Sequence, residues 1–473
     1  MIQTRPYLRQ WQAHPMREIL AGAVATFALI PEVIAFSFTA GIDPAVGLYA
    51  SFVISIVIAV FGGRPAMISA AAGSVALVVA PLVREHGVEY LFAAGLLAGL
   101  FQIVFGFARL SSLMRYVSSS VRTGFVNALA ILIFAAQLPH ILNAGAVGYG
   151  VIAAGLAIIY LGPRLTTKIP APLICVVVLT ALCAALGIEL PRVADLGALP
   201  QGLPGFHLPQ VPWGLELLSI IFAPALAIAM VGLLESLMTA GVVDDQTGTP
   251  SNKDAEARGL GLANVAASLF GGIAGCGMIG QTVSNVKYGG RGRLSTLAAG
   301  GLLLLFMVAA GDVIGQVPVA ALVAIMIMVS IDTLDWGSLR RLRATPRLSN
   351  LVMLTTVAVT VVSHNLSLGV LVGVLMSGVF FAAKVAALQQ VRREGDTYIV
   401  EGQLFFASAD AFVDAFDPSD HEGPVTIDLS GAKLWDITAA AAVEKVRQRF
   451  LAHEIGVTLR GMQGAAVAEV GRG

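Results

Sequence analysis

Two carboxylate side chains lie inside long apolar stretches of the chain. Glu32 follows the run Leu29-Ile30-Pro31, and Glu235 follows Leu233-Leu234. A carboxylate at such a place is costly, so it usually faces a water-filled cavity or a partner. A carboxyl that gains a proton or pairs with a cation avoids that cost. We therefore predict that Glu32 and Glu235 are ion-coupling groups. A hydrogen bond that only supports the structure is the alternative for each.

Two short segments interrupted by glycine could form an anion site. Residues 70–77 and 277–286 are too short to cross a membrane as uninterrupted helices. If their helical N-termini point at one another, unpaired backbone N–H groups and positive dipole ends would bind an anion without a buried Lys or Arg. Alternatively, the glycines only allow close helix packing. Both segments are accompanied by neutral donors, namely Ser69, Ser74, Gln281, Thr282, Ser284 and Asn285.

The composition places these groups in a membrane protein. Hydrophobic residues make up 57% of the 473 residues and charged residues 12%, whereas soluble domains carry about 25% charged residues. The formal net charge is zero, so no basic surface is available for nucleic acid. The three cysteines form no metal-binding pattern, and the chain has neither a P-loop nor a nucleophile–base pair. We expect no metal, no cofactor and no enzymatic activity.

Fourteen apolar runs predict a polytopic α-helical membrane protein. Loops rich in Lys and Arg alternate with loops that have almost none, such as 187–213, where Arg192 stands alone. Because cytoplasmic loops carry the positive excess, we predict cytosolic N- and C-termini in a bacterial inner membrane. The first run exceeds a signal-peptide core in length, so we expect no cleaved signal. The runs are 17–40, 45–62, 71–84, 89–107, 120–140, 147–162, 171–187, 214–240, 258–273, 279–287, 295–314, 317–335, 348–363 and 366–386.

Two sequence matches indicate an internal duplication. Thr39-Ala40-Gly41 recurs as Thr239-Ala240-Gly241, and Phe61-Gly62-Gly63 recurs as Phe270-Gly271-Gly272, in the same order. We expect each Thr-Ala-Gly triplet to end a span. Because seven is an odd number of crossings, two seven-segment repeats have opposite topology, which is typical of secondary transporters. We place the inverted repeats at about 17–187 and 214–386.

The composition changes near the C-terminal end. We predict a transmembrane domain over 1–388 and a small cytosolic α/β domain over 389–473, which is short enough to be a truncated version of a larger one. Strands are expected at 397–400, 403–406, 425–429 and 456–459, and helices at 408–416, with Ser408 as the cap, and at 438–453.

These features together resemble the sulfate permease (SulP) or solute carrier 26 family of anion transporters, and the resemblance covers nearly the whole chain. The tail resembles the family's STAS domain through Leu404-Phe405-Phe406-Ala407-Ser408-Ala409-Asp410 and Ile427-Asp428-Leu429-Ser430. The membrane part resembles it through Ile30-Pro31-Glu32, Gly47-Leu48-Tyr49-Ala50-Ser51-Phe52, Phe61-Gly62-Gly63, Leu234-Glu235-Ser236-Leu237, Gly261-Leu262-Ala263-Asn264 to Phe270-Gly271-Gly272, Asn285-Val286-Lys287 and Gly289-Gly290-Arg291.

The resemblance implies a UraA-like fold in which a core domain moves against a gate domain, and a homodimer in the lipid bilayer. It also implies a substrate site between the third and tenth segments. Two departures matter: family members often have Gln at the position of Glu32, and animal members often carry Arg near Gln281. An acid gained and a base absent favour proton-coupled symport, with sodium as the second choice. The implied site residues are Glu32, Ala71, Ala72, Gly73, Ser74, Glu235, Gln281 and Thr282.

The leading hypothesis is proton-coupled symport of a small anion. A dicarboxylate such as fumarate is favoured, because two carboxyl groups near the site suit proton coupling. Bicarbonate and sulfate are the alternatives within the same class. A nucleobase–proton symporter and an uncoupled anion channel remain the alternatives from other classes.

Overall fold

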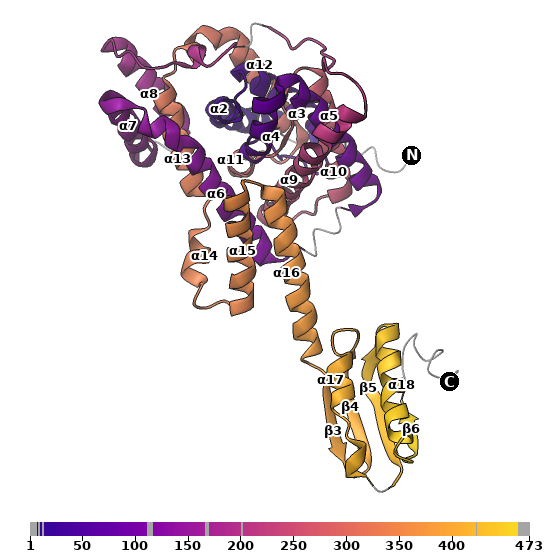
Figure 1. The fold of residues 1–473 in the computed structure, drawn as a ribbon. Coiled ribbons are helices and arrows are strands. Elements are labelled where there is room, and N and C mark those ends of the chain that lie inside the picture. The colour runs from indigo at the N-terminus through magenta and orange to yellow at the C-terminus, as the bar shows by residue number, and fades with distance from the viewer. Residues whose placement is uncertain are drawn as a thin grey trace. The chain divides into compact units, whose positions relative to one another are not determined.

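The computed structural model describes residues 7, 10–11, 14–110, 117–165, 170–199, 202–421 and 423–461. The chain divides into two compact units, Met1–Val372 and Gly373–Gly473. Figure 1 shows that the first unit consists almost entirely of helices, whereas the second carries a β-sheet.

The helices of the first unit follow the predicted apolar segments. Among the described residues, nine helices are long and apolar enough to cross a membrane, and Ala171–Ala185 and Arg347–Ser363 are shorter apolar helices. Each of the fourteen segments coincides with a helix, although the number of spans stays a prediction. The helices are α2 (Pro15–Ala40), α3 (Pro44–Phe61), α4 (Gly73–His86), α5 (Val88–Phe107), α6 (Ser119–Leu142), α7 (Gly145–Leu165), α8 (Ala171–Ala185), α9 (Leu215–Thr247), α10 (Lys253–Leu269), α11 (Ile279–Lys287), α12 (Arg293–Gly315), α13 (Val319–Thr333), α14 (Trp336–Arg341), α15 (Arg347–Ser363) and α16 (Leu366–Ala386), which continues into the second unit.

Only one of the two Thr-Ala-Gly triplets ends a helix. Gly41 closes α2 in the left-handed conformation, with φ of 72°, and its N–H bonds to the Phe38 carbonyl. The helix does not end at the second triplet, because α9 continues to Thr247 and ends at Gly248, with φ of 65°. Gly241 keeps helical geometry there, so its presence in the triplet does not by itself stop the helix.

Glycine allows α5 and α10 to cross at backbone contact. A Cβ atom at Gly99 would lie 2.6 Å from the Gly261 carbonyl oxygen, and one at Gly261 would lie 2.5 Å from the Gly99 carbonyl oxygen. Small residues at a helix crossing are typical of membrane proteins, where close backbone approach replaces the hydrophobic driving force. This crossing places Asn264, one turn further along α10, next to Gly275.

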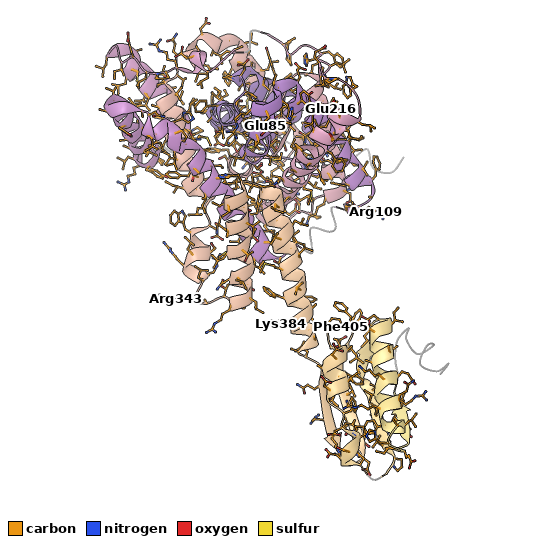
Figure 2. The ribbon with its side chains drawn as sticks, viewed as in Figure 1. Glu85, Arg109, Glu216, Arg343, Lys384 and Phe405 are labelled. Carbon is orange, nitrogen blue, oxygen red and sulfur yellow. The ribbon has the colours of Figure 1, made fainter. Side chains whose placement is uncertain are left out.

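Charged side chains lie at both ends of the first unit. Figure 2 shows Glu85 and Glu216 toward one end of this unit and Arg343 at the other. The predicted topology places Arg343 in a cytosolic loop by the positive-inside rule, and the alternation of spans then places both glutamates on the opposite side.

The second unit holds a four-stranded sheet in the order β3-β4-β5-β6. The strand β3 (Gln390–Glu394) pairs antiparallel with β4 (Thr397–Leu404), whereas β5 (Val425–Leu434) is parallel to both β4 and β6 (Val457–Arg460). Two helices, α17 (Ala409–Asp414) and α18 (Ile437–Leu451), supply Phe412, Val446 and Phe450 to the apolar core.

Three details of this unit differ from the prediction. The polar stretch after residue 389 forms β3, because an edge strand with mostly exposed side chains needs no apolar pattern. The runs 397–400 and 403–406 form one strand through Leu404, since Gly402 adopts φ of 105° and lets the chain continue. Ser408 precedes α17 without capping it, because its hydroxyl bonds to the Gln403 and Phe405 carbonyls.

Candidate functional site

The two short Gly-interrupted segments meet through a two-stranded sheet. The strand β1 (Ser69–Ala71) pairs antiparallel with β2 (Gly275–Gly277), so that Ala70 lies opposite Cys276. Each strand leads into a short helix, α4 after β1 and α11 after β2. Because the strands are antiparallel, these helices leave the sheet in opposite directions with their N-termini close together. This is the arrangement that the sequence predicts for an anion site.

The sheet is held by buried polar side chains. Asn264 accepts a hydrogen bond from the Gly275 N–H at 2.8 Å and donates to the Gly275 carbonyl at 3.2 Å and to Gln102 Oε1 at 2.8 Å. Ser236 Oγ accepts from the Gly277 N–H at 2.8 Å. A Cβ atom at Gly275 would lie 2.5 Å from the Ala70 carbonyl carbon, so only glycine fits between the strands. These contacts fix where α11 begins.

A cavity of about 360 Å³ opens at the N-termini of α4 and α11. Five of the predicted site residues line it: Glu32, Gly73, Ser74, Glu235 and Gln281. They come from α2, α4, α9 and α11, so segments from both repeats contribute. Pockets of 300–1,000 Å³ are typical of small-molecule sites, and this cavity is at the small end of that range.

Backbone donors of both short helices are available at this cavity. The first residues of α4 and α11 are Gly73 and Ile279, and neither helix has a side-chain hydrogen bond at its N-cap. The first N–H groups of a helix have no partner within the helix, so they can bind an anion. A Cβ atom at Gly73 would lie 2.7 Å from Phe36 Cε1, so glycine keeps the backbone of α4 close to this aromatic wall.

Glu235 is held in place by donors from both repeats. Its Oε2 accepts hydrogen bonds from Ser74 Oγ and from Cys276 Sγ, the latter at 3.1 Å. Ser74 stands in the first turn of α4, whereas Cys276 lies in β2. The hydroxyl hydrogen of Ser74 is therefore committed to Glu235, and Glu235 connects the two short segments.

Gln281 carries an unused donor beside Glu32. Its side chain is 2% exposed, and its amide lies close to the Glu32 carboxyl. The Nε2 atom nevertheless has no partner with hydrogen-bond geometry among the described residues. A buried polar group without a partner costs about 1–3 kcal/mol, so its presence indicates that something else satisfies it. An anion in the cavity would do so.

Three predicted site residues do not line this cavity. Ala71 and Ala72 are at most 2% exposed, the first in β1 and the second just before α4. Thr282 is fully buried, and its hydroxyl accepts from the Ile68 N–H at 3.0 Å and donates to the Ile68 carbonyl at 3.3 Å. The side chain of Thr282 therefore holds α11 against the segment before β1.

Residues that the sequence analysis missed complete the wall of the cavity. Phe125 comes from α6, and Met328 and Asp332 come from α13. Asp332 lies at the end of an apolar run, so the criterion that singled out Glu32 and Glu235 also applied to it. Phe125 carries no comparable signal, because an aromatic side chain in an apolar run is usually a packing residue.

The described residues contain no group of three His, Cys, Asp or Glu side chains that could hold a metal ion. The polar groups that line the cavity include two carboxyls close to helix N-termini, the Gln281 amide and Asp332.

The sequence matches the models of two known families. The sequence model of the sulfate permease family matches residues 16–151 and 151–356, and that of the STAS domain matches residues 389–469. The chain belongs to the sulfate permease family. The sequence resemblance is thereby confirmed, and the chain is an anion transporter of the membrane with a C-terminal STAS domain.

The relatives agree with this membership. The chain is 47% identical to the "Putative sulfate transporter YbaR" of Bacillus subtilis (strain 168), and the match covers 97% of each chain. The transmembrane domain of the cyanobacterial bicarbonate transporter BicA superposes with a TM-score of 0.67 at 26% identity, over 77% of this chain and 98% of that one. Murine solute carrier 26 member A9 in the inward-facing state gives 0.83 at 17% identity, over 99% of this chain and 89% of that one. This last likeness confirms the predicted fold class.

Proposed function

We propose that the protein is a carrier of a small inorganic oxyanion, sulfate or bicarbonate, which binds in the cavity between α4 and α11. The observation that carries this proposal is the buried Gln281 Nε2, which lies at the cavity beside the Glu32 carboxyl and has no partner with hydrogen-bond geometry among the described residues. An oxyanion offers several acceptor oxygens, so it can take this donor together with backbone N–H groups of both short helices. Neutral donors suit a transported substrate, because the carrier must release the anion as well as bind it.

The names of the relatives support an inorganic oxyanion rather than a dicarboxylate. YbaR is named for sulfate and BicA for bicarbonate. The preference for fumarate, which was drawn from the two carboxyl groups alone, gains no support from these names. Sulfate is our first choice, since the relative named for it shares 47% of the aligned residues.

We further propose that Glu32 couples transport to protons. Two unit charges 4 Å apart repel by about 4 kcal/mol at the effective dielectric of a protein surface, so an ionised Glu32 and a bound anion disfavour each other. A proton on Glu32 removes this repulsion, and the proton then travels with the anion. Sodium beside Glu32 is the second choice. Glu235, whose carboxylate already accepts two side-chain donors, would serve mainly to hold Ser74 and Cys276 in place.

We propose the assembly, the membrane location and the domain bounds as well. The protein would act as a homodimer in a bacterial inner membrane, with both termini in the cytosol. The transport domain would extend over 1–388 and the STAS domain over 389–473.

The experiment that tests the substrate is uptake into proteoliposomes that contain the full chain. Labelled sulfate, bicarbonate, fumarate and uracil are offered in parallel, and protein-free liposomes are the control. We expect uptake of sulfate or bicarbonate, and unlabelled substrate inside the vesicles should accelerate it, because carriers exchange. Uptake of uracil alone would refute the anion site, and anion flux without such acceleration would indicate a channel.

A further inference from the structure

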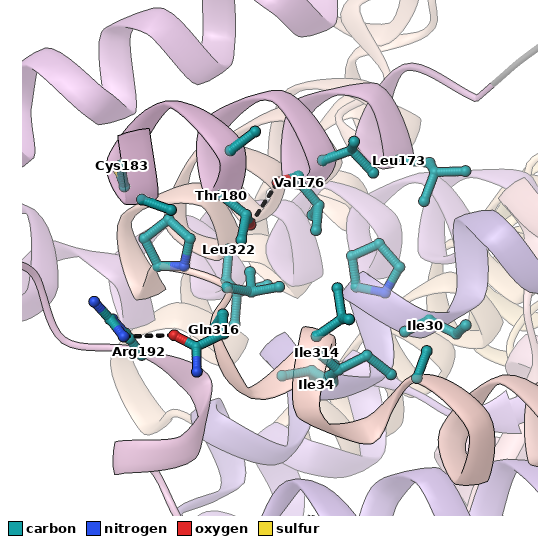
Figure 3. Close-up of a pocket in the computed structure, with 18 of the residues that line it drawn as sticks. Ile30, Ile34, Leu173, Val176, Thr180, Cys183, Arg192, Ile314, Gln316 and Leu322 are labelled. Carbon is teal, nitrogen blue, oxygen red and sulfur yellow. Dashed lines mark hydrogen bonds between the residues drawn. The ribbon is translucent and has the colours of Figure 1, made fainter. Parts of the chain in front are cut away.

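A second cavity, separate from the proposed anion site, lies between α2, α8, α12 and the start of α13. Its volume is about 690 Å³. Figure 3 shows α8 along one side, with Leu173, Val176, Thr180 and Cys183 on the face that borders the cavity. Residues 27, 30, 31 and 34 of α2 form the opposite wall, because positions three and four apart share one helix face.

The interior of this cavity is lined mostly by apolar side chains. Phe27, Ile34 and Leu322 are among the apolar side chains that line it. The Thr180 hydroxyl donates to the Val176 carbonyl at 2.7 Å within α8, so it needs no acceptor on a molecule in the cavity. Water gains little in such a cavity, because it needs two or more polar partners. A hydrocarbon chain is therefore the better occupant.

The cavity opens toward the surface between α8 and α12. Val177 and Val313 both line it, yet they are 58% and 65% exposed. In a helix bundle that spans the membrane, exposed valines at such an opening face lipid. The acyl chains of the bilayer are thus the hydrocarbon nearest to this opening, and one of them can enter the cavity from the lipid phase.

One end of the cavity carries both signs of charge. The Arg192 guanidinium donates to Gln316 Oε1, as Figure 3 shows, and the backbone of this loop bonds to residues 317 and 319 through Val193 N–H and the Pro191 carbonyl. Asp312 stands four residues before Gln316, on the same side of the last turn of α12. Arg192 is also the single Lys or Arg in residues 187–213, so this end lies at the membrane surface opposite the cytosol in the predicted topology.

We propose that this cavity is a binding site for a phospholipid with an ammonium headgroup, such as phosphatidylethanolamine. One acyl chain fills the space between α8 and α2, the phosphate pairs with Arg192, and the ammonium group donates to Asp312. A purely anionic headgroup would meet Asp312 as a like charge, and a choline headgroup has no N–H to donate. The site is distinct from the anion cavity, although Pro31 lines the one and Glu32 lines the other.

The test uses the full chain in nanodiscs and photoreactive lipids that carry a diazirine on one acyl chain. Phosphatidylethanolamine, phosphatidylcholine and phosphatidylglycerol are compared, and the labelled peptides are located by mass spectrometry. We expect phosphatidylethanolamine to label residues of α8 and α12 about fivefold more than the other two lipids, since one charge pair at the membrane surface is worth about that factor. Asp312→Asn should remove this preference, and Arg192→Gln should lower labelling by all three lipids.

Variants that fill the cavity separate this site from general contact with lipid. Ala184 lines the cavity, whereas its neighbour Ala185 does not. Ala184→Trp should reduce labelling of α8 and α12 at least fivefold, and the matched control Ala185→Trp should not. Ala184→Leu gives a milder filling if the Trp variant does not assemble as judged by size-exclusion chromatography. Equal labelling by the three lipids, or labelling that Ala184 variants leave unchanged, would overturn the assignment.

Discussion

Replacing Gln281 by leucine separates substrate binding from folding. The Nε2 of Gln281 is buried beside the Glu32 carboxyl and has no partner with hydrogen-bond geometry among the described residues, so the substitution removes no well-formed hydrogen bond of the fold. Leucine has a similar volume, and we expect a free energy of unfolding that is unchanged or higher by up to about 1 kcal/mol.

The same substitution should weaken anion binding strongly. A hydrogen bond to a charged group contributes about 1.5–3 kcal/mol, and about 1.4 kcal/mol corresponds to a factor of ten in affinity. We therefore expect Gln281→Leu to raise the dissociation constant of the transported oxyanion by roughly 10- to 150-fold. Isothermal titration of the purified protein measures the affinity, and thermal unfolding in the same detergent measures the stability.

Thr282→Val is the matched control, because it alters the next residue of the same helix. The Thr282 hydroxyl has partners at both the N–H and the carbonyl of Ile68, so its loss should destabilise the protein by about 1–3 kcal/mol. The affinity of the folded fraction should change less than threefold. If Gln281→Leu instead binds the anion as tightly as the wild type, or if Thr282→Val shows the larger loss of affinity, the assignment of the donor is refuted.

Three further predictions concern the elements that shape the two units. Gly73→Ala should lower the uptake rate more than tenfold, because its Cβ would displace Phe36 from the cavity wall, whereas Gly301→Ala, with nothing within 4 Å, should transport normally in the same assay. Asn264→Ala should reduce the free energy of unfolding by about 3 kcal/mol, since it leaves the Gly275 N–H unsatisfied in the core, and thermal unfolding checks this against the wild type. Asp436→Ala should cost the STAS unit about 1–2 kcal/mol, because Asp436 accepts from the N–H groups of Ala439 and Phe406, and hydrogen exchange across α18 reports the loss. Exchange that stays as slow as in the wild type would contradict the capping role.

The sequence predicts the elements of the site better than their contacts. A carboxyl in an apolar run and a short Gly-interrupted segment are local signals, and they locate Glu32, Glu235, α4 and α11. The partners of each side chain depend on the register of β1 and β2, which joins residues more than 200 positions apart. For that reason neither the commitment of Ser74 to Glu235 nor the structural role of Thr282 follows from residue type.

The misplaced boundaries have a similar physical origin. Gly241 resembles Gly41 in sequence, but α9 continues past it to Gly248, because helix ends depend on what packs beyond them. The strand β3 lacks an apolar pattern, since its side chains are mostly exposed at the sheet edge. Pairing with β4, which the sequence alone does not reveal, makes it a strand.

Proton coupling through Glu32 to an oxyanion bound between α4 and α11 can be tested directly. The most direct measurement compares Glu32→Gln with the wild type in proteoliposomes, recording sulfate and bicarbonate uptake with and without an inward proton gradient, together with exchange at equal pH. We expect the wild type to respond to the gradient, whereas Glu32→Gln should lose that response and keep exchange. Gradient-driven uptake by Glu32→Gln at the rate of the wild type would contradict this coupling role.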